Sequence, residues 1–98
     1  MSEFSIVVAL LAKEGKETEL RRDLAALVEQ SRKEDGNLRY ELFVDQSNPR
    51  RFVFVERWAS PEARNKHHTQ SDHIRDFHAH GVGNVETTEV AYFLDQVA

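Results

Sequence analysis

The chain contains no cysteine among its 98 residues, which excludes disulfide bonds and thiolate metal sites together. It also lacks an excess of positive charge, because 13 Lys and Arg stand against 17 Asp and Glu and leave a formal net charge of −4. Nucleic-acid binders need a cationic surface, so this balance argues against a general polyanion binder. No apolar run approaches the ~20 residues that span a bilayer, and no basic, apolar leader precedes the first strand-like run. We therefore expect a cytoplasmic protein with no membrane partner.

Hydrophobic periodicity predicts a single domain over residues 1–98, with four strands and two helices. The clearest helix covers residues 16–33, where Leu20, Leu24 and Leu27 recur at helical spacing, and Gly36 follows as a stop signal. The predicted strands cover residues 4–11, 37–45, 51–58 and 87–94, a turn covers 46–49, and the second helix covers 61–80. This second helix is polar and is either continuous or broken near residues 69–72.

These elements follow the order β-α-β-β-α-β, which is the order of a ferredoxin-like α+β fold. Because crossover connections are right-handed, the order favours a four-stranded antiparallel sheet with both helices on one face. The other face is also apolar, because alternation puts apolar residues on both faces of three strands: Val7 opposes Ile6 and Val8, Val53 and Val55 oppose Phe52 and Phe54, and Tyr92 opposes Phe93. A broad apolar face usually marks an interface, so we predict a homodimer in which two sheets pack together.

Three short motifs carry a resemblance to a known family. They are residues 34–42 (EDGNLRYEL), residues 54–58 (FVERW), and the pair His68 and His73 in the second helical region. In these motifs, in length and in element order, the chain resembles the antibiotic biosynthesis monooxygenase domain family, which includes small quinol monooxygenases. The resemblance implies a dimeric α/β-barrel. Members of the family include cofactor-free oxygenases of phenols and hydroquinones, haem-degrading enzymes, and an isomerase of a phosphorylated signalling molecule.

Glu56 is the most unusual residue of the third predicted strand. By alternation it shares one face with Phe54 and Trp58, and burying a carboxylate is costly unless the charge is paired. One interpretation is that Glu56 serves a pocket. The other is that it lies near the strand end and is bonded to Arg57, to Arg39 or to the start of the chain. Both interpretations remain open from the sequence.

Five histidines fall within fourteen residues of the second helical region: His67, His68, His73, His78 and His80. Histidine titrates near neutrality and is a natural general base at cellular pH. His67 and His68 point roughly 100° apart on a helix, so at most one of them faces the sheet squarely. The family pattern of two histidines five residues apart selects His68 with His73, whereas a histidine nine residues after Trp58 would select His67. We assign His68 as the candidate base and expect His78 and His80 to be exposed.

The resemblance also implies how a substrate is held. Asn37 and Tyr40 open the second strand, and each alone is ordinary turn or strand chemistry. Together with Phe54, Trp58 and His73, they resemble the polar and aromatic lining that family members use to hold a phenolic substrate.

The activity implied is oxidation of a small hydroquinone or phenolic compound by dioxygen, without a cofactor. His68, assisted by Glu56, takes the phenolic proton in this hypothesis, and the electron-rich anion then reduces dioxygen directly in an apolar pocket. The alternative is an isomerase, or a non-catalytic protein that binds a small molecule in the same dimeric barrel.

Two related functions fit the sequence less well. The haem-degrading branch of the family carries an asparagine, a tryptophan and an axial histidine where this chain has Ala9, His67 and Phe77. An RNA-recognition fold shares the topology and has aromatic residues on its third strand, as residues 51–54 do. However, the glycines of that motif are missing and the chain is acidic, so we expect no nucleic-acid partner.

A metal site is the remaining alternative for the histidine-rich region. His68 with Asp72, and Asp76 with His80, have the i, i+4 spacing that puts two ligands on one helix face. The sequence has no HExxH motif and offers no obvious third ligand, so we predict no functional metal.

Overall fold

The computed structural model describes residues 3–98 and has the order β-α-β-β-α-α-β, with a short 3-10 helix before the last strand. The strands are β1 (Phe4–Ala12), β2 (Asn37–Asp45), β3 (Asn48–Trp58) and β4 (Val85–Leu94). The helices are α1 (Glu17–Arg32), α2 (Pro61–Gln70) and α3 (Asp72–His80), and η1 (Val82–Asn84) is the 3-10 helix. Within this described part of the chain, no helix is long and apolar enough to cross a membrane.

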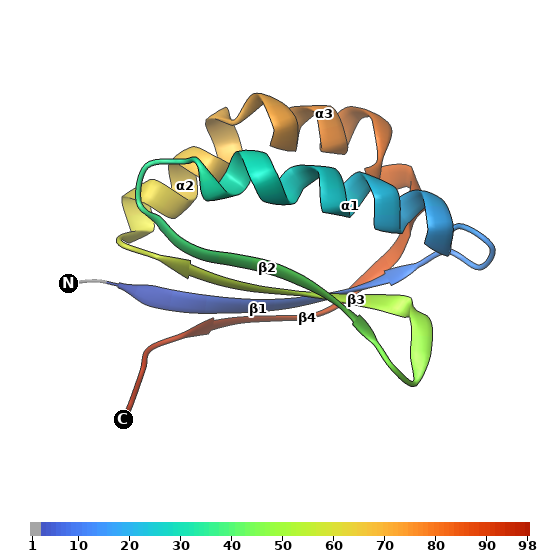
Figure 1. Cartoon of the computed structure of the whole chain (residues 1–98), viewed down its shortest axis with the longest axis horizontal. Helices are drawn as coiled ribbons and strands as arrows, with labels where there is room; N and C mark the ends of the chain where they lie inside the picture. Colours follow the sequence, from blue (N-terminus) through green and yellow to red (C-terminus); the bar gives the residue numbers. More distant parts are fainter. Residues whose placement is uncertain (1–2) are drawn as a thin grey trace.

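The four strands form one antiparallel sheet in the order β2-β3-β1-β4. All three helices lie on one side of this sheet (Figure 1). The predicted ferredoxin-like sheet with helices on one face is therefore confirmed. The register places Tyr40 opposite Glu56, and Leu42 opposite Phe54, on the face that points toward the helices.

The second helical region consists of two helices, because the backbone of Ser71 is extended, with φ −79° and ψ 129°. Of the two sequence alternatives, the broken helix is confirmed. The start of α2 also follows its sequence signals. The hydroxyl of Ser60 accepts a hydrogen bond from the backbone N–H of Ala63 at 3.1 Å, and Pro61 occupies the first turn.

The connection between β2 and β3 is shorter than the sequence indicated. The predicted turn over residues 46–49 is confirmed only at residues 46 and 47, because β3 already begins at Asn48, which pairs with Asp45. Two-residue connections suit antiparallel hairpins. Pro49 lies among the first residues of β3, where a missing backbone donor is tolerated.

The hydrophobic core lies between α1 and the sheet. Leu20 and Leu24 of α1 are fully buried and belong to one cluster with Ile6 of β1 and Phe52 of β3. The helices α2 and α3 contribute less, since Ile74 is their only buried hydrophobic residue in the part of the chain that the structure describes. This uneven packing leaves space beneath α2 and α3.

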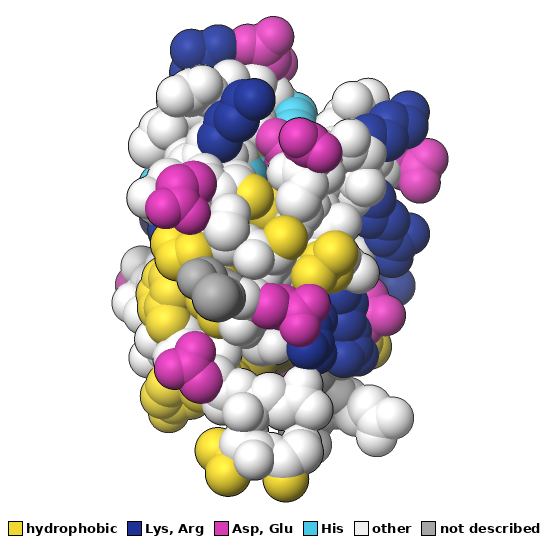
Figure 2. All heavy atoms as spheres, turned by 90° about the vertical axis from the view of Figure 1, so that its left-hand side faces the viewer, with side chains coloured by type: hydrophobic (Ala, Val, Ile, Leu, Met, Phe, Trp, Pro, Cys, Tyr) yellow, Lys and Arg dark blue, Asp and Glu magenta, His cyan; other side chains and the backbone are white. Residues whose placement is uncertain are grey.

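The sheet face that points away from the helices is largely apolar. Val7 of β1 lies between Val55 of β3 and Tyr92 of β4, and Val53 pairs with Phe43 of β2. We call these five residues the outer face; Phe43 and Tyr92 are 48% and 54% exposed. Figure 2 shows hydrophobic side chains in the middle and lower parts of this view, with charged side chains beside them as well as above them. The predicted apolar face is thus present, and the homodimer itself stays a prediction.

Candidate active site

A cavity of about 230 Å³ lies between the sheet and the helices α2 and α3. We call it the inner cavity. Its apolar walls come from several elements, among them Val8 of β1, Phe54 of β3, and Ile74 and Phe77 of α3. Its polar side chains are Tyr40, Glu56, Arg64, His67, His68, His78 and Thr88. Apolar walls with a few convergent polar groups are typical of a small-molecule site.

A second depression, of about 480 Å³, lies where the end of α1 meets α2 and the start of α3. We call it the outer cleft; its walls include Glu34, Ser71 and His73. His67 is the only residue within positions 3–98 that lines both the inner cavity and the outer cleft. Since His67 is also buried, it forms part of the wall between the two spaces.

Contacts on several sides hold the imidazole ring of His67. Its centroid lies 4.7 Å from the ring of Trp58 and 5.4 Å from the ring of Tyr40. Its Nδ1 is hydrogen-bonded to Oε1 of Glu34. Burial lowers the pKa of His67, and the hydrogen bond and charge of Glu34 offset part of this effect. A neutral imidazole at neutral pH is the form that acts as a general base.

Glu34 reaches His67 because the loop that follows α1 comes close to α2 at Gly36. Gly36 has a φ of +84°, and a Cβ at this position would lie only 2.5 Å from the Cβ of Ala63 on α2. Because Gly36 lies against α2, Glu34, two residues before it, also lies beside α2. Its second oxygen, Oε2, accepts a hydrogen bond from the hydroxyl of Ser71.

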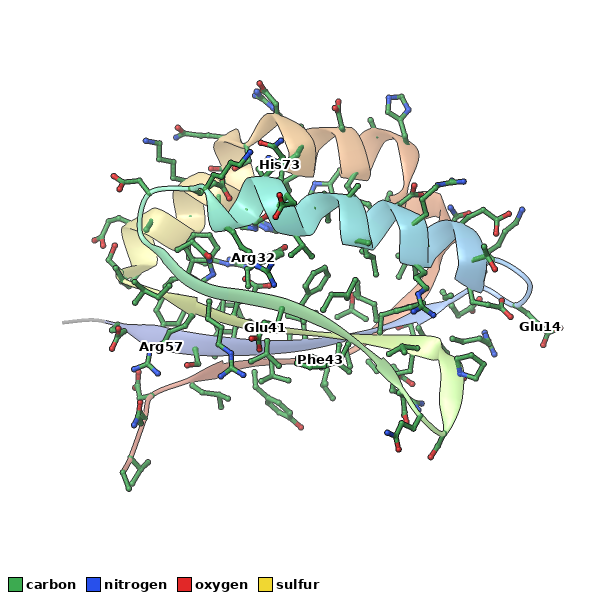
Figure 3. All side chains as sticks on the ribbon, in the orientation of Figure 1. Glu14, Arg32, Glu41, Phe43, Arg57 and His73 are labelled. Carbon is green, nitrogen blue, oxygen red and sulfur yellow. The ribbon has the colours of Figure 1, made fainter. Side chains whose placement is uncertain are left out.

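His73, labelled in the helical layer of Figure 3, completes a cluster around Glu34. Its Nε2 lies 3.6 Å from Oε1 of Glu34 and 3.1 Å from the hydroxyl oxygen of Ser31. The candidate ligand atoms of Glu34, His67 and His73 all lie within 4.8 Å of one another, so this group could hold a metal ion. Each of these atoms already has a hydrogen-bond partner in the protein, however, which satisfies the cluster without an ion.

The ligand pairs considered from the sequence lie elsewhere. Within residues 3–98, none of His68, Asp72, Asp76 and His80 belongs to a group of three potential metal ligands. Asp72 instead forms an ion pair with Arg75 on the exposed side of α3. Helical spacing could not predict the group around Glu34, because its three members come from three parts of the chain.

Glu56 is buried, with 8% of its surface exposed, and it lines the inner cavity. The indole Nε1 of Trp58 donates a hydrogen bond of 2.9 Å to its carboxylate. Burial raises the pKa of Glu56, while the bond from Trp58 and the charge of Arg64 offset part of the rise. Of the two sequence interpretations, the strand-end pairing is not observed, because Arg57 is bonded to Glu3 and Gln96 instead.

Tyr40 and Phe54 line the inner cavity side by side, with ring centroids 5.1 Å apart. Burial and the nearby carboxylate of Glu56 raise the pKa of Tyr40 well above its usual range, so its hydroxyl keeps its proton and can donate a hydrogen bond. Trp58 is fully buried and does not line the inner cavity. It contacts two residues that do, because its ring packs against His67 and its indole N–H donates a hydrogen bond to Glu56.

The remaining predicted site residues occupy different positions. His68 lines the inner cavity but is exposed, and partial burial with the charges of Arg64 and His78 lowers its pKa. His73 lies in the outer cleft. Asn37 lines neither space, and its side-chain amide donates to the backbone oxygen of Arg39 at 3.2 Å.

Two side chains of this region were missed by the sequence argument. Arg64 lines the inner cavity, and its guanidinium lies 5.1 Å from the ring centroid of Phe93. Its spacing of three and four residues from His67 and His68 could have pointed to a shared helix face. No comparable signal marks Glu34, which lies 33 residues from His67 in the chain.

Residues 4–80 match the sequence profile of the family described as "Antibiotic biosynthesis monooxygenase". The chain belongs to this family. A relative from Bacillus subtilis (strain 168), named "Putative monooxygenase YcnE", is 36% identical over 66 residues, which are 67% of this chain and 68% of the relative. The resemblance stated from the sequence motifs is therefore confirmed.

Solved structures show the same fold. SO0527 from Shewanella oneidensis is 35% identical, with a TM-score of 0.83 over 94% of this chain and 90% of that one. PA3566 from Pseudomonas aeruginosa is 26% identical, with a TM-score of 0.87 over 100% of this chain and 97% of that one. The family profile covers residues 4–80, the two solved structures share the fold over nearly the whole chain, and the name of the family indicates an oxidoreductase of the monooxygenase type.

Proposed function

We propose that this family member is a monooxygenase that oxidises a small hydroquinone or phenol with dioxygen and without a cofactor. The observation that carries the proposal is the inner cavity, an apolar space with His67 in its wall and Glu34 bonded to one nitrogen of that histidine. The family and the name of its relative YcnE support the monooxygenase class. The substrate class and the absence of a cofactor are carried over from the resemblance to the family, and the size and aromatic walls of the cavity suit such a substrate.

His67 is the base that this geometry favours. The sequence argument selected His68, and both side chains line the inner cavity. His67 is buried, and the bond from its Nδ1 to Glu34 leaves Nε2 as the nitrogen that can accept a proton. His68 is exposed and has no hydrogen-bond partner among the described residues. We therefore assign the base to His67 and retain His68 as the second candidate.

The reaction begins when the substrate hydroxyl transfers its proton to Nε2 of His67. The resulting phenolate is electron-rich and reduces dioxygen directly, while the apolar walls limit access of water. For a phenol with a free para C–H bond, addition of dioxygen and loss of water gives a quinone. One oxygen atom enters the product, the other leaves as water, and the ring supplies all four electrons. Arg64 stabilises the phenolate charge that develops in the cavity.

The size of the inner cavity supports a small aromatic substrate. Its volume of about 230 Å³ is below the roughly 300–1,000 Å³ of sites for drug-sized ligands, which favours one ring or two fused rings. Phe54 and Phe77 offer aromatic faces to such a ring. The protonated hydroxyl of Tyr40 donates to a substrate oxygen, and Glu56 accepts from a second hydroxyl group where the substrate has one.

We infer further that the protein acts as a homodimer joined through the outer face. Charged pairs lie at both ends of this apolar surface. At one end Arg51 of β3 binds Asp45 at 2.9 Å and Glu89 at 2.6 Å, and at the other Arg57 binds Glu3 at 2.8 Å. An apolar centre with a polar rim is the usual composition of a protein interface.

Oxygen uptake tests the proposed activity. Wild-type protein without added flavin, haem or metal should consume oxygen with menadiol or a simple phenol faster than the background reaction. His67→Ala should lower turnover on the order of 10²–10⁴-fold, the usual contribution of a positioned general base. His80→Ala, an exposed histidine of α3, is the control and should retain the wild-type rate.

Two outcomes would change the proposal. If His68→Ala loses activity and His67→Ala does not, the base is His68 and the reaction class stands. If no quinol or phenol of the panel raises oxygen uptake above background, the oxygenase proposal is contradicted, and isomerisation or ligand binding becomes the better hypothesis.

A further inference from the structure

We propose that Glu34 is a positioning residue, which holds His67 in the tautomer that carries its proton on Nδ1 and stabilises the charge that the ring acquires as a base. The catalytic part of this inference rests on the proposed function. The location of the proton on His67 is a property of the protein alone, so it can be tested without a substrate.

The hydrogen bonds of Glu34 determine which nitrogen of His67 carries the proton. An ionised carboxylate can only accept hydrogen bonds, so the bond between Oε1 of Glu34 and Nδ1 of His67 requires the hydrogen to be on Nδ1. In a neutral ring this leaves the lone pair on Nε2. The hydroxyl of Ser71 donates to Oε2 and holds the carboxylate from its other side.

Glu34 acts on the ring from the side opposite the substrate. It lines the outer cleft and does not line the inner cavity, whereas His67 lines both. A ligand in the inner cavity would therefore meet His67 and would not contact Glu34. Any effect of Glu34 on the reaction has to pass through the imidazole, which makes it a positioning residue and not a catalytic one.

The charges around His67 explain why this partner is needed. The groups that face the ring or share its cavity are Glu34 beyond the end of α1, Arg64 on α2, His73 on α3, Tyr40 on β2 and Glu56 on β3. Burial, Arg64 and His73 all lower the pKa of His67, and Glu34 opposes them with a hydrogen bond and a charge. Without Glu34, the imidazolium formed by proton transfer would be poorly stabilised in its buried position.

A purely structural role for the cluster makes a different prediction. Glu34, Ser71 and His73 join the end of α1 to α2 and α3, and they could serve only to hold these helices together. Glu34→Gln has almost the same size and keeps an acceptor oxygen. If the role were only structural, a folded Glu34→Gln protein would retain the wild-type tautomer and turnover.

Nitrogen-15 NMR of the histidine rings tests the inference directly. In wild-type protein, His67 should show the Nδ1–H tautomer at neutral pH, a measurement that needs no variant. In Glu34→Gln, the neutral amide can donate to Nδ1 as well as accept from it, so the preference for this tautomer should weaken, and loss of the negative charge should lower the pKa of His67. Asp35→Asn is the matched control, because Asp35 is the next residue, is exposed, and lines the same cleft. A wild-type ring protonated on Nε2, or an unchanged ring in Glu34→Gln, would overturn the inference.

Kinetics test the same residue in the reaction. Glu34→Gln should lower kcat by roughly 10²-fold or more with little change in KM, because the substrate does not contact Glu34. Glu34→Asp keeps the charge and should recover part of the loss. A kcat loss in Glu34→Gln no greater than that in Asp35→Asn would contradict the inference. If the wild type oxidises no compound of the panel, the proposed function fails, and the NMR result alone decides the role of Glu34.

Discussion

His67 and His68 are adjacent in the chain but have different surroundings. One step along α2 rotates the side chain by roughly 100°, which places His67 between Trp58 and Tyr40 and leaves His68 exposed near His78. Burial lowers the pKa of both rings, so both are neutral at neutral pH. A base also needs a fixed direction for its lone pair. The hydrogen bond that Nδ1 of His67 donates to Glu34 gives that direction to His67.

Glu56 carries a stability cost that depends on pH. Burial raises its pKa above the unfolded value, so the protonated form is favoured in the folded protein. The stability associated with this group is fully present below the unfolded pKa and is lost as pH rises through the folded pKa. Glu56→Gln keeps an oxygen that can accept from Trp58 and removes the buried charge. We expect Glu56→Gln to melt at a higher temperature than wild type at pH 7.5.

The difference between Glu56→Gln and wild type should disappear as pH falls toward 4, because the wild-type carboxyl then becomes neutral as well. Thermal melts from pH 4 to pH 8 measure this, and a change of 1 kcal/mol moves Tm by roughly 4–8 °C in a domain of this size. Glu62→Gln, at an exposed position of α2, is the control and should follow the wild type. A constant difference at every pH would show that charge burial is not its cause.

At the scale of the elements, the contact between α2 and the loop that joins α1 to β2 depends on Gly36. Gly15 and Gly36 have nearly equal positive φ values of +82° and +84°, but a Cβ at Gly15 meets nothing within 4 Å, whereas one at Gly36 meets Ala63 at 2.5 Å. Gly15→Ala should therefore cost only the backbone term, about 1–2 kcal/mol. Gly36→Ala adds a clash between this loop and α2 and should cost roughly 3 kcal/mol or more.

Urea unfolding of the two alanine variants measures the difference directly, and it isolates the packing term because the backbone strain is matched. The double variant Gly36→Ala/Ala63→Gly should recover part of the loss, since it removes the methyl group that clashes. Equal destabilisation of Gly15→Ala and Gly36→Ala would mean that the loop and α2 do not meet closely at this point.

Local signals explain why most elements could be predicted from the sequence. The spacing of Leu20, Leu24 and Leu27 marks α1, and the pair Ser60 and Pro61 marks the start of α2. The turn between β2 and β3 was predicted two residues too long, because residues 48 and 49 have the composition of a turn and yet belong to the strand. Their pairing across the hairpin outweighs their local preference.

The site was predictable only where it follows strand alternation. Phe54, Glu56 and Trp58 share a strand face, and the structure places them around His67 and the inner cavity. The partnership of Glu34 with His67 joins residues 33 positions apart. It depends on the contact at Gly36 and on the break between α2 and α3, which set how each helix is rotated. No periodicity in the sequence records these rotations.

In the molecule as a whole, the helices cover one face of the sheet and leave the other face uncovered. Three helices cover one side of the sheet, while the outer face keeps apolar side chains in contact with water. Soluble monomers rarely expose a broad apolar surface. Two outer faces packed against each other would bury it symmetrically, with the ion pairs of Arg51 and Arg57 at the rim.

Light scattering at micromolar concentration should report twice the 11.3 kDa mass of one chain. Val55→Asp places a charge at the centre of the outer face and should convert the protein to monomers or reduce its solubility, because desolvating an unpaired carboxylate opposes association. Ala25→Asp, at an exposed position of α1 on the covered side of the sheet, is the control and should remain dimeric. A wild-type protein that is monomeric and fully soluble at these concentrations would contradict the sheet-to-sheet dimer. In that case the outer face would have to be stable in water, and the inner cavity of a single chain would have to support the reaction alone.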